Sequence, residues 1–130
     1  MNKDEILHLF FNLFESIDAT DLMTTRLFAI ISESGIEREV FRLLVARLSV
    51  LKELGIHAVQ HKEFENIGRG LFSMHLQGHN FNIRILYSFL SDHRPVLLLT
   101  FYERQGKRKT DYSSYIPQAL ELLKQYKEEK

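Results

Sequence analysis

Hydrophobic and polar residues alternate in the second half of the chain, as expected for a β-sheet whose two faces have different surroundings. Between Phe81 and Leu90 every odd position is apolar or aromatic, whereas the even positions include Asn82 and Arg84. A period of two residues is typical of a strand with one face on the core. We therefore expect Arg84 and Tyr87, which have opposite parity, to lie on opposite faces, with Tyr87 in the core.

Two further segments are expected to pair with this strand. Residues 96–102 form an almost continuous apolar run, which is typical of a strand covered on both faces. Residues 70–76 are a third strand-like segment, and the links at 77–80 and 91–95 contain Gly, Asn, Asp and Pro, which favour hairpin loops. The sequence therefore predicts a meander of three antiparallel strands.

The first part of the chain shows the spacing of amphipathic helices instead. The first expected helix is capped by Asp4 or Asn2 and ends between Ser16 and Ala19. The others run from Thr20 or Asp21 to Gly35 and from about Glu37 to Leu54, with Gly55 as the last stop. A short final helix is expected to begin at Pro117. Helices, then strands, then one helix predict an α+β fold, with N-terminal helices packed on a small antiparallel β-sheet.

Length and composition limit the remaining choices. A chain of 130 residues with 45% hydrophobic content is expected to form one domain, with a helical region at 1–55 and the sheet, a basic segment and the last helix at 56–130. There is no cysteine, which excludes disulfides and thiolate metal sites. No apolar run approaches the roughly 20 residues of a membrane span, and the N-terminus does not resemble a secretory signal. We expect a cytoplasmic protein without a membrane partner.

The net charge of zero conceals an asymmetry between the two parts of the chain. Residues 1–56 carry six basic and nine acidic side chains, whereas residues 57–130 carry 11 and eight, which gives formal charges of −3 and +3. The basic residues gather in the segment 103–110, ERQGKRKT, directly after the last expected strand. A basic cluster beside a sheet favours binding of a polyanion such as RNA. The histidines do not share a metal-ligand spacing, so we expect no metal and no cofactor.

These segments also resemble a known family. The stretches LKELGI from Leu51, then GRGLFSMHL, FNIRILYSF and VLLLTFYERQGKRKT, followed by an amphipathic helix, resemble the RelE/ParE toxin superfamily, particularly its HigB-like and phage-derived members. The resemblance extends over residues 51–130. It implies a RelE-like fold and the toxin of a bacterial type II toxin-antitoxin system, a ribosome-dependent endoribonuclease that cleaves mRNA. The implied partners are the ribosome, mRNA and a cognate antitoxin, expected to be a small helix-turn-helix protein.

The resemblance also implies roles for individual residues. Arg84 matches the strand arginine of the family and would stabilise the phosphate, with His75 or Tyr102 within reach for proton transfer. Contacts with RNA phosphates are implied for Lys62, Arg69, Arg104, Lys107, Arg108 and Lys109. Cleavage by the neighbouring 2′-hydroxyl needs a base, stabilisation of charge at the phosphate and an acid, and the implied mechanism uses no metal.

Several positions depart from the family pattern. Ser73, Met74 and His75 stand where many relatives have Glu-Leu-Arg, Thr100 stands in place of a histidine, and Glu103 occupies a position where lysine is common. These changes remove positive charge from the surface implied for cleavage. An opening β-strand before the first helices, frequent in the family, is also missing from the predicted elements.

Two other classes of function stay open. The first is a catalytically degenerate relative, a binding module that binds RNA or a protein partner without cleavage. The second is an oligomer, such as a homodimer, built through the N-terminal helices, with Arg84 as an ion-paired or snorkelling residue and 103–110 as an ordinary solvated loop. A concave basic surface that holds Arg84 near His75 or Tyr102 would favour the nuclease, whereas a large apolar interface would favour the oligomer.

Overall fold

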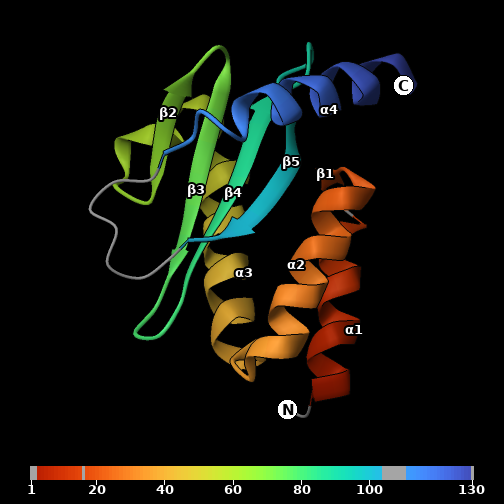
Figure 1. The fold of residues 1–130 in the computed structure, drawn as a ribbon, viewed down its shortest axis with the longest axis vertical. Helices are drawn as coiled ribbons and strands as arrows, with labels where there is room; N and C mark the ends of the chain where they lie inside the picture. The colour runs from red at the N-terminus through yellow and green to blue at the C-terminus, as the bar shows by residue number, and fades with distance from the viewer. Residues whose placement is uncertain (1–2, 16, 104–110, 130) are drawn as a thin grey trace.

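A mixed five-stranded sheet lies between two helical layers in the computed structural model, which describes residues 3–15, 17–103 and 111–129 (Figure 1). The elements in chain order are α1 (Lys3–Phe14), β1 (Asp18–Ala19), α2 (Asp21–Ser34), α3 (Glu37–Leu54), the 3₁₀ helix η1 (Gly55–Gln60), β2 (Phe64–Gly68), β3 (Leu71–Gln77), β4 (Asn82–Phe89), β5 (Pro95–Tyr102) and α4 (Ile116–Glu129). The predicted α+β class is confirmed.

The sheet has the strand order β1-β5-β4-β3-β2. The three predicted strands correspond to β3, β4 and β5, which pair antiparallel through short hairpin links as expected. Two strands were not expected: β2, which pairs antiparallel with β3, and β1, whose two residues pair in parallel with Val96 and Leu97 of β5. The sheet is therefore mixed, and the prediction of a purely antiparallel sheet is wrong at β1.

The helix predictions differ from the structure at one end. The first helix was expected to reach Ser16 to Ala19, but α1 ends at Phe14, because Asp18 and Ala19 join the sheet beside β5. Thr20 then begins α2 as its N-cap, where its Oγ1 accepts a hydrogen bond from the backbone N–H of Met23 at 3.1 Å. α3 has the predicted bounds, Glu37–Leu54.

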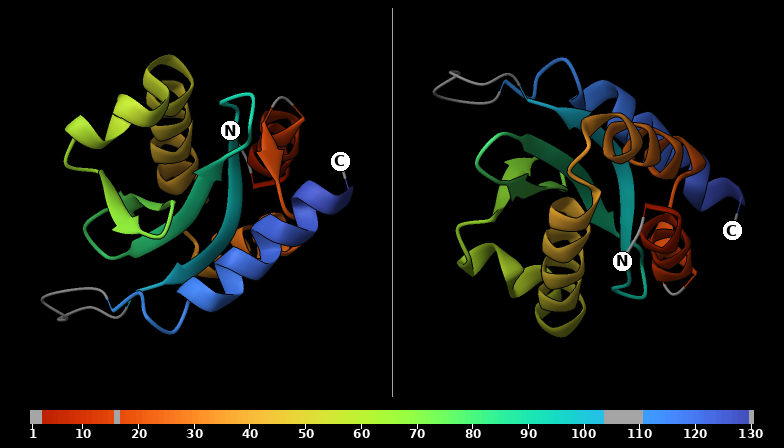
Figure 2. Two further views of the ribbon diagram at one scale, coloured as in Figure 1. Left: turned by 90° about the horizontal axis from the view of Figure 1, so that it is seen from above. Right: turned by 90° about the horizontal axis from the view of Figure 1, so that it is seen from below.

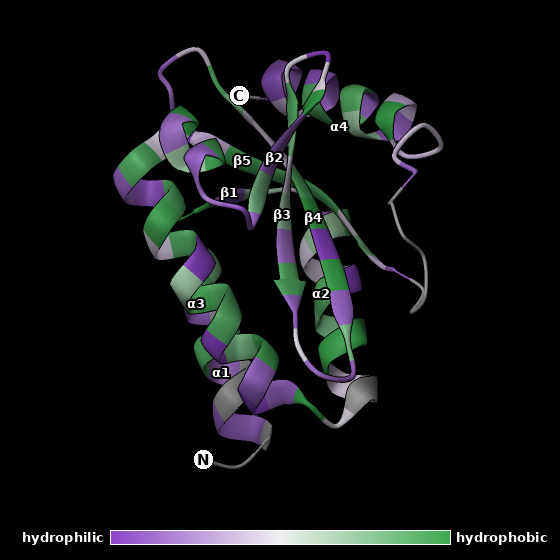
Figure 3. Cartoon of the chain, turned by 90° about the vertical axis from the view of Figure 1, so that its left-hand side faces the viewer, coloured by the Kyte–Doolittle hydropathy of each residue, from purple (hydrophilic) through white to green (hydrophobic). Residues whose placement is uncertain are grey.

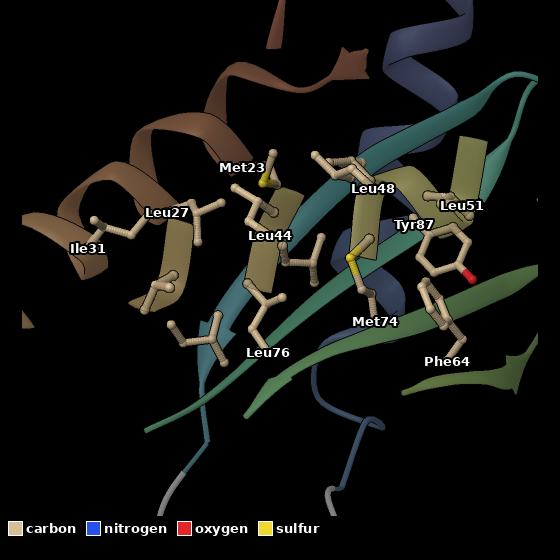
Figure 4. Packing of buried hydrophobic residues seen from close by; sticks show 14 of the residues in the cluster. Met23, Leu27, Ile31, Leu44, Leu48, Leu51, Phe64, Met74, Leu76 and Tyr87 are labelled. Atoms are coloured by element: carbon tan, nitrogen blue, oxygen red, sulfur yellow. The ribbon is translucent and has the colours of Figure 1, made fainter. Parts of the chain in front are cut away.

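One face of the sheet is covered by α1, α2 and α3. Buried side chains on this side come from the three helices and from alternate positions of β3 and β4; ten of them are labelled in Figure 4. They include Leu44, Leu48 and Leu51 from α3, and Met74 and Tyr87 from the sheet. Tyr87 is fully buried, which confirms the assignment of its face.

The other face of the sheet is covered by α4, which lies on the opposite side from α3 (Figure 2). The apolar cluster under α4 consists of Leu71, Leu86, Leu90, Val96, Leu98, Leu99, Phe101 and Ala119. Most of these positions lie near the start of β3, the end of β4 and the start of β5, which are at the same end of the sheet. Toward the β3–β4 hairpin, hydrophilic positions interrupt the hydrophobic ones along both strands (Figure 3). This end of the sheet carries the candidate site.

The longest helix, α3, is amphipathic. Val40, Leu44, Leu48 and Leu51 are buried, whereas Arg42 is exposed. Within residues 3–15, 17–103 and 111–129, none of the helices combines the length and the apolar character needed to cross a bilayer.

Candidate functional site

The site is built around two residues that face each other across neighbouring strands. His75 of β3 pairs directly with Arg84 of β4, and side chains at such paired positions lie on the same face, with Cβ atoms about 5 Å apart. Both are partly exposed on the α4 side of the sheet. The alternation along β4 predicted that Arg84 and Tyr87 lie on opposite faces, and the structure confirms it. Two of the residues implied by the resemblance, His75 and Arg84, are thus brought together.

Glu65 of β2 joins this pair. Its Oε1 accepts a hydrogen bond from His75 Nε2 at 3.1 Å and another from the Tyr112 hydroxyl at 2.6 Å. The same hydroxyl is hydrogen-bonded to Ser73 Oγ at 2.9 Å. We call Glu65, Ser73, His75, Arg84 and Tyr112 the polar cluster; it combines residues from β2, β3, β4 and the segment before α4.

The electrostatic surroundings of His75 favour its neutral form. Burial, followed by the charge of Arg84, lowers the pKa of His75 below its usual value of 6.5, against the opposing effect of Glu65. Since a carboxylate only accepts hydrogen bonds, His75 Nε2 carries the proton that Glu65 binds. In this tautomer Nδ1 has a free lone pair, so His75 is suited to act as a base near neutral pH.

Tyr112 is held in place by its own contacts. Its ring lies edge-on to Phe101, with centroids 6.3 Å apart, and Tyr115 stacks on the same phenylalanine at 3.8 Å. Burial and the hydrogen bond to Glu65 raise the pKa of Tyr112 to about 12, so its hydroxyl is protonated at neutral pH. Tyr112 therefore acts as a hydrogen-bond donor that fixes the carboxylate of Glu65.

Arg84 has donors that its protein neighbours do not use. Its Nε and Nη1 are buried, and neither has a hydrogen-bond partner in the part of the chain that the structure describes. A buried donor without a partner carries a desolvation penalty of about 1–3 kcal/mol, more for a charged group. The rest of the residue is partly exposed on the α4 face beside His75, so the positive charge of the guanidinium is suited to attract a phosphate there.

Tyr102 is not part of this arrangement. It pairs with Ile83, whose side chain belongs to the core on the α1–α3 side, so Tyr102 lies on the face opposite to Arg84. Its hydroxyl donates to the carbonyl oxygen of Asn80 at 3.0 Å. The structure therefore separates Tyr102 from His75 and Arg84, and the tyrosine found beside them is Tyr112.

The residues implied to contact RNA are spread over the molecule. Lys62 is exposed and lines a hollow together with His75. Arg69 is in the β2–β3 turn with a positive φ of 58°, six residues from His75 and thus roughly 20 Å away along the strand. Four more lie outside the described residues: Arg104, Lys107, Arg108 and Lys109.

Two positions that depart from the family pattern have structural contacts here. Thr100 is buried, and its hydroxyl donates to the backbone carbonyl of Arg84 at 2.8 Å. Glu103 is also buried, and its backbone N–H donates to the carbonyl of Asn82 at 2.7 Å. Both bonds join β5 or its end to β4, the strand that carries Arg84.

Sequence reasoning missed Glu65 and Tyr112 as site residues. Glu65 belongs to β2, a strand of five residues whose sequence, FENIG, has too little alternation to predict a strand. Tyr112 follows the basic segment and precedes α4, where its sequence neighbours show no periodic pattern. Only the pairing of β2 with β3 brings Glu65 opposite Ser73, and only the path of the chain before α4 brings Tyr112 to both.

The cluster has the groups needed for proton transfer at a phosphate: a neutral imidazole, a carboxylate that orients it and a guanidinium with free donors. Within the described residues, no group of three or more His, Asp or Glu side chains is arranged to hold a metal ion. In comparisons with known proteins, no family model matches the chain and no curated protein matches its sequence.

Proposed function

We propose that this protein is the toxin of a type II toxin-antitoxin system and cleaves mRNA on the ribosome at the polar cluster. The observation that carries the proposal is the cross-strand pair of His75 and Arg84 on a partly exposed sheet face, with His75 oriented by Glu65. In this proposal the ribosome and mRNA are the targets, and a small helix-turn-helix antitoxin is the neutralising partner.

The roles follow from the chemistry of each group. His75 Nδ1 accepts the proton of the ribose 2′-hydroxyl, and the 2′-oxygen forms a bond to phosphorus while the bond to the 5′-oxygen breaks. Arg84 stabilises the negative charge that develops on the phosphate oxygens. A water molecule protonates the leaving 5′-oxygen, and the hydroxide formed takes the proton from the imidazolium of His75, which gives a 2′,3′-cyclic phosphate, a 5′-hydroxyl and neutral His75. Glu65 and Tyr112 act through His75 as positioning residues.

The arrangement of the elements supports the proposal. The resemblance extends over residues 51–130 and implies an antiparallel meander followed by a closing helix, and β3, β4, β5 and α4 follow that order. The missing opening strand was an argument against the resemblance. β1 does not supply this strand, because it follows α1 and pairs in parallel with β5, so this departure from the family pattern stands.

A binding module that does not cleave RNA is the second candidate. Two observations favour it. The carboxylate of Glu65 lies in the polar cluster and offsets part of the positive charge of Arg84. Thr100, which stands in place of a family histidine, is buried and hydrogen-bonded to the backbone. Such a protein would bind RNA or a protein partner through Arg84 and would leave the RNA intact.

The deciding experiment is a toeprint assay on translating ribosomes with wild type, Arg84→Ala and His75→Ala. We expect wild type to produce new mRNA ends in the A site, and each substitution to lower the cleavage rate by roughly 100-fold or more. Arg42→Ala is the matched control, because Arg42 is an exposed arginine of α3 outside the polar cluster. Circular dichroism establishes that each variant is folded. Stalling without cleavage by folded wild type would reject the nuclease and leave the binding module.

A further inference from the structure

A hollow at the edge of the sheet lies next to the polar cluster. It has a volume of about 390 Å³ and is lined by Arg47 of α3, Lys62 and Glu63 before β2, and His75 and Gln77 of β3. We call it the edge hollow. His75 belongs to both the edge hollow and the polar cluster, so the two sites share one residue.

The edge hollow exists because β2 is shorter than β3. β2 begins at Phe64, which pairs with Met74, so β3 extends past its neighbour toward Gln77. The backbone N–H of His75 still donates to the Glu63 carbonyl at 2.8 Å. The carbonyl of His75 instead accepts a hydrogen bond from Arg47 Nε at 2.9 Å. The guanidinium of Arg47 thus takes the place of a strand neighbour at this point.

This hydrogen bond uses only Nε of Arg47, so the two terminal nitrogens of the guanidinium stay available for a ligand. Its Nε is anchored, whereas the four N–H groups on Nη1 and Nη2 have no acceptor among residues 3–15, 17–103 and 111–129. The half-buried position and the anchored Nε restrict the rotamers of this side chain. An arginine held in this way can bind two oxygens of one phosphate with two parallel hydrogen bonds.

The charge of the lining favours an anion. Arg47 and Lys62 contribute two positive charges and Glu63 one negative charge, while His75 is predominantly neutral near pH 7. Neither Arg47 nor Lys62 forms an ion pair with any carboxylate in the part of the chain that the structure describes. Two cations that line one open hollow without an ion-pair partner among the described residues are positioned for an external phosphate.

From this geometry we infer that the edge hollow binds a backbone phosphate of the RNA strand, on the nucleotide next to the bond cleaved at the polar cluster. The inference rests on the proposed function, because it assigns the path of the same RNA strand past His75. Arg47 would hold the phosphate through its Nη atoms, and Lys62, which lines the same hollow, would add a second charge. The strand would then pass from the open face of the sheet around its edge.

The test is an NMR titration of the full chain with a trinucleotide whose 2′-hydroxyls are methylated, which prevents cleavage. We expect the Arg47 Nε–H resonance and the backbone amides of Lys62 and Glu63 to shift together with those of His75 and Arg84. Arg47→Met and Lys62→Met should each weaken binding by about tenfold, the order expected for loss of a charge-assisted hydrogen bond to phosphate. The double substitution should also reduce the dependence of log Kd on log salt by roughly 0.7, the value for one phosphate of a single strand.

Arg42→Met is the matched control, because Arg42 is an exposed arginine on the same helix that does not line the edge hollow. It should leave both Kd and the salt dependence unchanged. Arg47→Lys keeps the positive charge but loses the planar guanidinium with its paired donors. This variant should therefore bind the trinucleotide more weakly than wild type and more strongly than Arg47→Met.

The outcomes separate this inference from the proposed function. Shifts at His75 and Arg84 without shifts at Arg47 and Lys62 would refute the edge hollow and leave RNA binding at the polar cluster. A trinucleotide that shifts no resonance up to its solubility limit overturns the inference, and the toeprint assay then decides independently whether cleavage stands. Binding of an acidic peptide in the edge hollow, with no response to the trinucleotide, would also overturn it and would assign the surface to a protein partner.

Discussion

Replacing Tyr87 with Phe should make the protein more stable, although the substitution only removes an oxygen atom. Tyr87 is fully buried among aromatic rings, with centroid distances of 5.4 Å to Phe72, 5.8 Å to Phe89 and 6.4 Å to Phe64. Its hydroxyl has no hydrogen-bond partner in the part of the chain that the structure describes, and burial raises its pKa well above the usual value. The hydroxyl is visible beside Phe64 in the core view (Figure 4).

The size of the effect follows from the penalty for a buried polar group. An unsatisfied hydroxyl destabilises the folded state by about 1–3 kcal/mol, and the small space left by the oxygen offsets part of the gain. We therefore expect Tyr87→Phe to raise the free energy of unfolding by about 1 kcal/mol. For a chain of 130 residues, an unfolding entropy of about 2.1 cal/mol/K per residue converts 1 kcal/mol into a rise in Tm of about 4 °C.

Tyr126→Phe is the matched control, because it removes the same atom from a hydroxyl that has a partner. The Tyr126 hydroxyl donates to Asp18 Oδ1 at 2.6 Å, and this bond connects α4 with β1. Its loss should lower the free energy of unfolding by about 1 kcal/mol, since Asp18 keeps its ion pair with Arg94 at 2.9 Å. Both variants are measured by thermal and urea unfolding followed by circular dichroism. If Tyr87→Phe destabilises the protein as much as Tyr126→Phe, the hydroxyl of Tyr87 has a partner and the reasoning is wrong.

Two further predictions concern the polar cluster and the hairpin beside it. Burial and the charge of Arg84 lower the pKa of His75 below 6.5, so the unfolded chain binds a proton at this residue more readily than the folded chain does. Neutral His75 therefore contributes to the free energy of unfolding above pH 6.5, and this contribution is lost as the pH falls through the pKa of the folded state. NMR titration should give a pKa below 6.5 for His75, and a lower value still in the variant Glu65→Gln. On acidification, the free energy of unfolding of His75→Gln should fall less than that of wild type. A pKa of His75 above 6.5 would contradict this account. Gly78→Ala should destabilise the protein by about 1–3 kcal/mol in urea unfolding. The new Cβ would lie 2.2 Å from Cε1 of Phe81, whose ring is buried and has little room to shift. A variant as stable as wild type would refute this close approach.

The elements that could be predicted from sequence are those long enough to show a period. α3 has 18 residues and was predicted with its observed bounds, and the eight residues of β4 alternate clearly enough to separate Arg84 from Tyr87. β1 has two residues and β2 has five, so neither contains enough positions to define a period. Their pairing depends on contacts between segments that are distant in sequence, such as Asp18 beside Val96, which local patterns do not encode.

The candidate site could be predicted only in part for the same reason. Arg84 and His75 occupy regular strand positions, so parity and the order of the strands bring them together. Glu65 reaches them through the unpredicted β2, and Tyr112 through an irregular segment before α4. Tyr102 was named as a candidate among the roles implied by the resemblance, but the alternation along β5 places it on the other face.

The position of the polar cluster follows from how far α4 covers its face of the sheet. Along β3 this face changes from Leu71, under α4, to Ser73 and His75; along β4 it changes from Leu86 to Arg84. The change occurs at neighbouring levels of both strands, near the place where cover by α4 gives way to the segment that carries Tyr112. Under the helix an apolar residue is required for folding, whereas beyond it a small polar residue would satisfy the fold equally well. An arginine with unused donors and a histidine held by a carboxylate exceed that structural need, so selection for a ligand is the simpler explanation of both.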